Sequence, residues 1–410
     1  MKKRTLFLTI LCSILTLSSC GKESSISEII SNSISVSIDT SISISYDPNV
    51  YEEYEEEDYD DNLPPDYYDV DETKVPANDF HTKEQYCYIK SAYDLVSLFA
   101  RGKAELSQPT YLKFDYRDAA LKTKTTYFEL GLDENFTQSM IYKNDGSIIN
   151  LYNLFVNQHY YYRVAREEGE LKGAEVKEFT TNDTAPRNIR LDGVTNVRDL
   201  GGYRSKFGGR IRQGLFYRGA RLNNAGDNEP ALLLTDAGMK TFTQDLKIKN
   251  ELDLRYFDED SDERGYMRDG EIEGCTYNSF PMPGSITVAD RMVDEKHKEE
   301  IAKLFHLLAK KESYPVYLHC AIGTDRTGLV AYLLENLLGM YRTDIYHDFL
   351  FSNFGNIGSS RDISVIKDRY ERHLKDYNKK THASACAQYL MDLGITEEEI
   401  ISIRKIFIER

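Results

Sequence analysis

The chain contains no tryptophan and few cysteines, and the cysteine positions exclude two common ways of stabilising a small fold. Its 410 residues, long enough for two or three domains, include six cysteines at positions 12, 20, 87, 275, 320 and 386. Such scattered positions do not form a disulfide framework, although the sequence leaves open whether Cys87, Cys275 or Cys386 pair. None of them stands at metal-ligand spacing with histidine, so we expect no zinc site.

Long apolar runs are also missing, apart from one at the N-terminus. Lys2, Lys3 and Arg4 precede an apolar stretch over 6–17, which is too short for a convincing membrane span and is typical of a secretory signal. The ending Leu17-Ser18-Ser19-Cys20 resembles the lipobox of bacterial lipoproteins. This resemblance implies a lipoprotein signal peptide over 1–20, lipidation of Cys20, and a protein held outside the cytoplasmic membrane by its lipid anchor. An ordinary signal peptide and a plain N-terminal anchor are the alternatives.

Positive charge is absent between Asp47 and Glu72, where acidic residues account for most of the net charge of −16. Before this run, residues 24–45 alternate serine and isoleucine. Neither composition can bury a core, so we expect residues 21–74 to form a disordered, extended tether. The net charge therefore says little about the folded part, and it gives no support for nucleic-acid binding.

Short β-like segments follow, over 111–116, 126–131, 139–142, 160–164 and 174–180. Their spacing and their many aromatic residues predict a small all-β sandwich over 75–184. The stretch from Leu154 to Val164 resembles the tyrosine corner of fibronectin type III domains, with Tyr160 as the corner residue. By this resemblance the module either binds a ligand or holds the following domain away from the membrane.

From Ala185 onward the pattern becomes α/β. Helices are predicted over 234–246 and 294–311, and a final helix begins with a capping box at Thr396. Strands are predicted over 251–255, 276–280 and 316–319. Strands that alternate with helices indicate a central, mainly parallel sheet flanked by helices, here over 185–410. Ligands of such sheets bind at the carboxyl ends of the strands. Cys320 directly follows a predicted strand and is therefore expected at that edge.

The most informative stretch runs from Val316 to Met340: an apolar run, a loop that Cys320 opens and Arg326 closes, and an apolar helical pattern. A loop at a helix N-terminus directs backbone N–H groups and the positive end of the helix dipole at one point, which suits a phosphate. Five residues between cysteine and arginine can wrap around one phosphate, with the sulfur facing phosphorus and the guanidinium on two oxygens.

The same donors favour the thiolate, and such surroundings lower a cysteine pKa from about 8.5 to roughly 3.5–7.5. Gly323 permits a turn where a Cβ would clash. The Thr327 hydroxyl is placed to hydrogen-bond the sulfur or to assist a second step. The segment therefore predicts a cysteine nucleophile that is ionised at neutral pH.

Residues 319–328 resemble the HCxxGxxRTG loop of the cysteine-dependent phosphatases, the protein-tyrosine and dual-specificity superfamily. The resemblance implies a phosphatase domain in which Cys320 and Arg326 are catalytic, a thiophosphate intermediate forms, and no metal or cofactor takes part. It also implies that the rest of the loop binds the substrate phosphate: His319, Ala321, Ile322, Gly323, Thr324, Thr327 and Gly328. A buried structural cysteine beside a helix is the alternative.

A second motif, Asn196-Val197-Arg198-Asp199-Leu200-Gly201-Gly202-Tyr203, resembles a bacterial branch of this superfamily, together with segments 215–220, 252–255 and 346–350. That branch includes secreted tyrosine and dual-specificity phosphatases, some of which also accept phosphoinositides. We expect Asn196, Arg198 and Asp199 to form a polar corner that supports the loop, with Asp199 holding Arg198 or an arginine of the loop. A solvent-exposed turn with a surface ion pair is the alternative.

The general acid is left open between two aspartates. Asp325 lies inside the loop, and relatives with Lys-Asp-Arg there are thought to use that aspartate; Asp290, on a separate segment, is the second candidate. Relatives active on inositol lipids usually carry lysine where this chain has Thr324. The sequence thus favours phosphotyrosine over phosphoinositide or dual-specificity substrates. A non-catalytic surface binding lipoprotein is the competing class.

Overall fold

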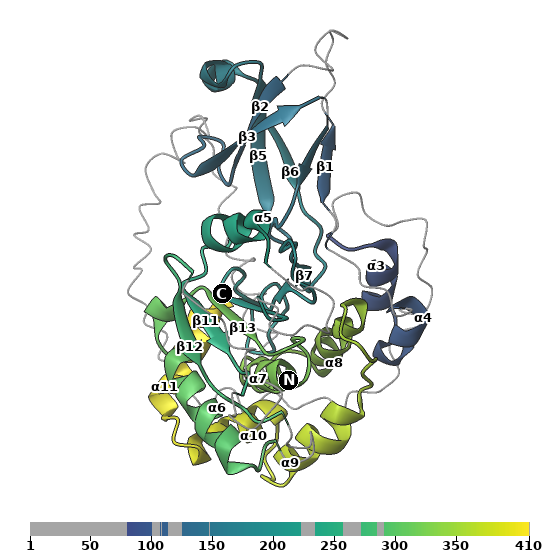
Figure 1. Cartoon of the computed structure of the whole chain (residues 1–410), viewed down its shortest axis with the longest axis vertical. Helices are drawn as coiled ribbons and strands as arrows, with labels where there is room; N and C mark the ends of the chain where they lie inside the picture. The colour runs from purple at the N-terminus through teal and green to yellow at the C-terminus, as the bar shows by residue number, and fades with distance from the viewer. Residues whose placement is uncertain are drawn as a thin grey trace, which may run out of the picture. The chain divides into compact units, whose positions relative to one another are not determined.

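The computed structural model describes residues 80–100, 107, 109–113, 125–146, 148–222, 234–256, 272–284 and 291–409 (Figure 1). The predicted signal peptide with Cys20, the predicted tether and Asp290 lie outside these residues. Within these ranges, no helix has both the length and the apolar character needed to cross a membrane.

A six-stranded sheet forms the centre of the C-terminal part. Its strands lie in the order β12 (Thr276–Ser279), β11 (Asn250–Asp253), β13 (Val316–His319), β10 (Phe216–Gly219), β8 (Arg198–Asp199) and β7 (Arg187–Asn188). The first four strands are mutually parallel, whereas β8 and β7 pair antiparallel. The prediction of a mainly parallel sheet is therefore confirmed.

The central strands β13 and β10 are buried along their whole length, so both faces of the sheet are covered there. Val316 and Leu318 of β13 contribute to the largest apolar cluster, and Tyr317 between them belongs to a second cluster with Phe242 of the segment after α5. Tyr317 also satisfies its hydroxyl, which donates to the Ala220 carbonyl at 2.6 Å. The alternation along β13 thus separates two cores, one on each face.

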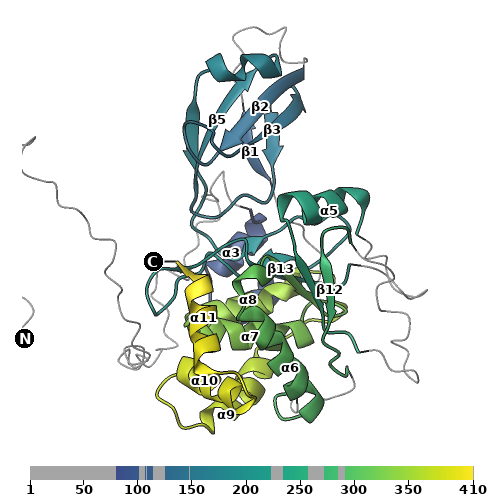
Figure 2. The same cartoon turned by 90° about the vertical axis from the view of Figure 1, so that its left-hand side faces the viewer.

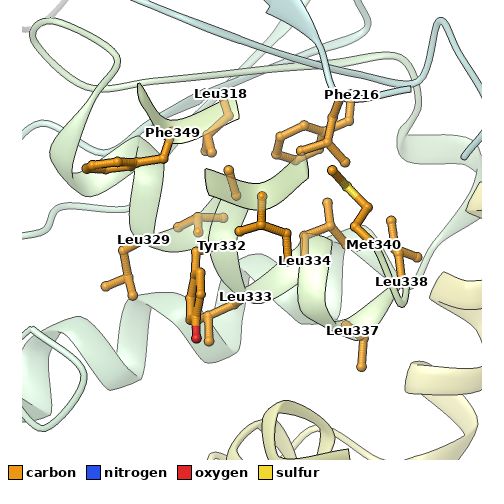
Figure 3. Close-up of a cluster of buried hydrophobic side chains, with 14 of the residues drawn as sticks. Phe216, Leu318, Leu329, Tyr332, Leu333, Leu334, Leu337, Leu338, Met340 and Phe349 are labelled. Atoms are coloured by element: carbon orange, nitrogen blue, oxygen red, sulfur yellow. The ribbon is translucent and has the colours of Figure 1, made fainter. Parts of the chain in front are cut away.

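Helix α7 (Asp325–Leu337) lies in the middle of the larger cluster, and every residue of it after Asp325 is buried. Figure 3 shows Leu329, Leu333, Leu334 and Leu337 of this helix among side chains from neighbouring elements. Burying each leucine contributes roughly 1.5–3 kcal/mol. Because α7 is buried throughout, its first turn is held firmly against the end of β13.

The flanking helices begin where the sequence predicts. Asp294 caps α6 (Glu295–Leu308) by accepting from the His297 N–H at 3.0 Å, and Thr396 forms the expected capping box of α11 (Glu397–Phe407). Thr235 caps α5 (Asp236–Lys240), which continues as a π-helical turn over Thr241–Asp245. Figure 1 shows α6, α10 (His382–Asp392) and α11 grouped around α7.

The strands of the N-terminal part form two antiparallel sheets (Figure 2). One pairs β1 (Thr110–Lys113) with β4 (Ile148–Leu151); the other has the order β3 (Ser139–Asp145), β2 (Thr125–Gly131), β5 (His159–Ala165), β6 (Lys177–Thr180). Residues of both sheets, such as Phe128 and Ile149, share one apolar cluster with Tyr160. The Tyr160 hydroxyl accepts from the Phe155 N–H at 2.9 Å, as a tyrosine corner requires. Assignment of the module to the fibronectin type III class stays a prediction.

The segment before these strands is helical, so the expectation of an all-β region from residue 75 is wrong there. Helices α3 (Lys83–Ile89) and α4 (Val96–Ala100) bury Tyr88 and Val96 in the same cluster as α7. The missed signal is the capping box of Thr82 and Gln85, which starts α3. The C-terminal core therefore includes chain that precedes the sandwich strands.

Candidate active site

The predicted loop connects β13 to α7 at the carboxyl edge of the parallel strands. Gly323 has φ +71, and a Cβ added there would lie 2.2 Å from the carbonyl oxygen of Gly219, the last residue of the neighbouring strand β10. Glycine is required for both reasons, since another residue would be strained and would push the loop off β10. The expected turn at Gly323 is confirmed.

Cys320 is 2 % exposed at the start of this loop. Burial raises the pKa of its thiol, but the charge of Arg326 and the neighbouring Thr327 lower it, with a net result of about 7. Among the described residues the Thr327 hydroxyl has no hydrogen-bond partner, so its bond to the sulfur stays a prediction. A substantial fraction of the thiol is therefore ionised at neutral pH.

The Arg326 side chain is buried and reaches the ends of two further parallel strands. Its Nη1 donates to the carbonyl oxygens of Met282 at 3.0 Å and Leu254 at 3.5 Å, which follow β12 and β11. Strand ends, the loop and the helix N-terminus thus meet at one place, as the α/β pattern predicts.

Asn196 supports the loop from a separate segment. Its Nδ2 donates to the Ile322 carbonyl at 3.0 Å and to the Thr324 hydroxyl at 3.3 Å, and its Oδ1 accepts from Arg198 Nη1 at 2.7 Å. Asn196 itself has φ +60, a conformation that asparagine tolerates better than most residues. The expected polar corner exists; Arg198 and Asp199 are buried in it and Asn196 is partly buried, so it is not a solvent-exposed turn.

Asp348 of α8 (Arg342–Phe351) links this corner to the loop. Its carboxylate accepts from Arg198 Nε at 2.7 Å and from Arg218 Nη1 at 2.6 Å, and Arg218 Nη2 donates to the Gly323 carbonyl at 3.2 Å. Burial raises the pKa of Asp348, but the two arginines lower it overall, and the neighbouring Glu335 has a pKa well above its usual range because of burial and the Asp348 charge. We name Arg198, Arg218, Asp348 and Glu335 the buried tetrad.

Asp199 does not hold Arg198 or an arginine of the loop, so that prediction is wrong. Neighbouring residues of a strand point to opposite faces, and Asp199 on β8 therefore points away from Arg198's partners. Its carboxylate accepts from Arg187 Nη1 at 2.8 Å and from the N–H groups of Gly201 at 2.8 Å and Gly214 at 2.6 Å. Asp199 thus fixes the Gly-Gly turn rather than the loop.

His319 lies in the core, with its side chain fully buried. Nε2 lies 3.1 Å from Glu251 Oε1 and Nδ1 lies 3.7 Å from Asp253 Oδ1. Burial lowers the pKa of His319, but the two carboxylates raise it overall. The side chain supports the strands below Cys320, and the structure does not place it on a substrate-facing surface.

Thr324 is also fully buried, so its side chain does not lie at the rim of a pocket. A Cβ at Gly328 would lie only 3.0 Å from the Phe349 ring, so this position has a structural reason to lack a side chain. Contacts of Ala321, Ile322 and the loop N–H groups with a phosphate stay predictions.

Asp325 and Arg361 form an ion pair beside the thiol, with Nη2 to Oδ2 at 2.9 Å. Sequence reasoning missed Arg361, because no motif surrounds it and it lies 36 residues after its partner. Arg218 and Asp348 stood inside family-like segments, yet their roles could not be read from the chain order.

Among the residues described, no group of three or more His, Cys, Asp or Glu is placed to hold a metal ion. Within the described ranges the four cysteines are buried and form no disulfide, so they do not pair with one another.

Comparison with known proteins gives a consistent family. The family model described as "Tyrosine phosphatase family" matches residues 189–409, more than half of the 410 residues. A protein of Cupriavidus necator assigned by name to the tyrosine-protein phosphatases is 27% identical over 187 residues, covering 41% of this chain and 64% of that protein. A tyrosine-protein phosphatase of Nostoc commune is 24% identical over 126 residues, covering 26% and 43%. The chain thus spans less than two thirds of the length of these relatives.

Among solved structures, P. aeruginosa TpbA in complex with pTyr is similar at 18% identity, with 45% of this chain and 88% of that chain covered and a TM-score of 0.25.

Proposed function

The chain belongs to the tyrosine phosphatase family, and we propose that it hydrolyses phosphate monoesters, with phosphotyrosine preferred, through a thiophosphate intermediate on Cys320. The observation that carries this proposal is the Cys320 thiol, whose pKa of about 7 arises at the start of a loop that Arg326 closes. A thiol that is ionised at neutral pH and placed at a helix N-terminus suits nucleophilic attack on an anionic phosphate ester.

Two displacements follow from this arrangement. The Cys320 thiolate attacks phosphorus, so an S–P bond forms and the ester P–O bond breaks, while the loop N–H groups and Arg326 stabilise charge on the equatorial oxygens. Water then hydrolyses the S–P bond and releases inorganic phosphate. The buried tetrad and Asn196 keep the loop in place between the two steps, because they hold its carbonyl groups at Ile322 and Gly323.

The phosphotyrosine preference is supported by the family and by the absence of a lysine at position 324. One observation favours a second candidate, a phosphoinositide or other multiply charged ester. Arg291 is 6 % exposed, its Nε and Nη1 have no hydrogen-bond partner among the described residues, and its charge helps to lower the pKa of Asp325. Buried guanidinium N–H groups that lack a partner are costly, and a second anionic group on the substrate would stabilise them.

The test is phosphate release by the reduced full chain and its Cys320→Ser variant from a phosphotyrosine peptide, a phosphoserine peptide and a phosphoinositide. We expect the substitution to lower kcat by roughly three orders of magnitude or more, while Cys275→Ser, at a buried cysteine in the other core, keeps activity. Vanadate should inhibit and EDTA should not. If the wild-type chain releases nothing from any substrate, the competing binding-protein function takes its place. Preference for the phosphoinositide would support the second candidate.

We also propose that the protein is extracytoplasmic and anchored by a lipid on Cys20, from the signal-like N-terminus alone. Metabolic labelling with a fatty acid should tag the full chain and not a Cys20→Ala variant. Equal labelling of both, or a protein that fractionates with the cytoplasm, would contradict the anchor.

A further inference from the structure

Asp325, the first residue of α7, is held by one side chain from a distant segment. Arg361 lies between the turn Ser352–Phe354 and the π-helical segment Val365–Tyr370. Its Nε donates to Asp325 Oδ1 and its Nη2 to Oδ2, both at 2.9 Å. Planar, bidentate pairs of this kind fix the orientation of the carboxylate. The two side chains are 21% and 19% exposed, so water can reach them.

Arg361 is fixed independently of Asp325. Its Nη1 donates to the Ser359 carbonyl at 2.6 Å and to the Ser359 hydroxyl at 2.8 Å. Its backbone N–H donates to Asn353 Oδ1 at 2.7 Å, and its carbonyl accepts from Asn353 Nδ2 at 2.9 Å. The guanidinium would therefore stay in place if Asp325 turned away, so the pair can open and close again.

Asp325 faces positive charge from three sides. Burial raises its pKa, but Arg361 on the distant segment, Arg291 before α6 and Arg326 on its own helix lower it overall. Two further titratable groups face it, Cys320 and Tyr370. In the free protein Asp325 is therefore a carboxylate at neutral pH, and a carboxylate has no proton to give to a leaving group.

We propose that Arg361 is a positioning residue that holds Asp325 ionised in the free enzyme, and that Asp325 becomes the general acid only when the substrate phosphate enters the loop. This inference rests on the proposed phosphatase function. A substrate that arrives as the monoanion transfers its proton to Asp325, and the dianion then remains in the loop. When the S–P bond forms and the ester bond breaks, that proton moves to the leaving oxygen. Asp325 returns to the carboxylate and, in the second step, accepts a proton from the attacking water while the S–P bond breaks and the Cys320 thiolate is restored. Asp325 gives that proton to the departing phosphate, which leaves as the monoanion, and the carboxylate then pairs again with Arg361.

The experiment uses the full chain and two aryl phosphates whose leaving groups differ in basicity. p-Nitrophenyl phosphate needs little help from an acid, whereas phenyl phosphate needs much. We expect Asp325→Asn to lower kcat for phenyl phosphate about 100-fold more than for p-nitrophenyl phosphate, and to remove the alkaline limb of the kcat against pH profile. Arg361→Gln removes a positive charge and should move that alkaline limb to higher pH by about one unit. Arg361→Lys keeps the charge, so its alkaline limb should lie close to that of the wild type.

The double variant tests the link between the two residues. Once Asp325 is Asn, adding Arg361→Gln should leave the pH profile unchanged. Arg372→Gln, at an exposed arginine of α9 (Glu371–Lys375), is the matched control and should behave as wild type. Thermal unfolding checks that each variant is folded, and Arg361→Lys serves if Arg361→Gln is not.

Two results would overturn the proposal. If Asp325→Asn lowered kcat equally on both esters, the general acid would be another residue. If the alkaline limb of the kcat–pH profile did not move in a folded Arg361→Gln variant, Arg361 would not control the protonation of Asp325. A failure of the phosphatase function itself looks different, because the wild-type chain would then be inactive on both esters, or Cys320→Ser would keep the wild-type rate.

Discussion

Two aspartates at the Cys320–Arg326 loop, Asp325 within it and Asp348 on α8, are each paired with arginine, and they differ in burial. Asp348 is fully buried and accepts from both Arg198 and Arg218, whereas Asp325 is 21% exposed and, among the described residues, accepts from the side chain of Arg361. Water cannot replace an ionic partner in the buried core, so the Asp348 ion pairs have a structural role. Asp325 is partly exposed, so water can replace Arg361 as its partner, and the carboxylate can then take part in chemistry.

The largest effect is expected from Asp348→Asn. Loss of the carboxylate leaves two arginines facing each other in the core and weakens the Arg218 bond to the Gly323 carbonyl. We expect the free energy of unfolding to fall by about 3–5 kcal/mol, and kcat to fall with it. Equilibrium denaturation by urea measures the loss.

Asp325→Asn is the matched comparison for that experiment. Since its pair is partly exposed, we expect less than about 1 kcal/mol of lost stability, although kcat on a poor leaving group should fall. Asp376→Asn, on an exposed aspartate after α9, should change neither quantity. Equal destabilisation by Asp348→Asn and Asp325→Asn would show that burial does not separate the two pairs.

The smallest effect is expected at Thr327, which stabilises the thiolate without forming an ion pair. Thr327 is one of the residues that lower the pKa of Cys320 to about 7. Thr327→Ala removes the hydroxyl, so the pKa should rise by roughly one unit. The rate of Cys320 alkylation by iodoacetamide should then increase with pH later than in wild type, while Thr327→Ser should keep the wild-type profile. A midpoint that moves to lower pH or stays in Thr327→Ala would contradict a role for this hydroxyl.

The sequence predicted most of the C-terminal fold, because the signals for these elements are local. Capping residues at Asp294 and Thr396 mark helix starts, and the apolar run before His319 marks a buried strand. The error at residues 83–100 arose because this helical segment buries its apolar side chains against α8 and the turn Ser352–Phe354, far along the chain. Nothing within the segment itself says which domain it completes.

The loop from Cys320 to Arg326 was determined by the sequence alone, since its residues are consecutive and one strand-to-helix turn brings them together. Its partners were decided only by the tertiary structure. Asp348 meets Arg198 across 150 positions, and Arg361 meets Asp325 across 36. Side chains that far apart in the sequence come together only when the sheet and helices pack. A buried charge requires an ionic partner, and the packing determines which residue that partner is. The Cys320–Arg326 loop thus lies in one segment of the chain, whereas the positions and protonation of the groups around it depend on the whole fold.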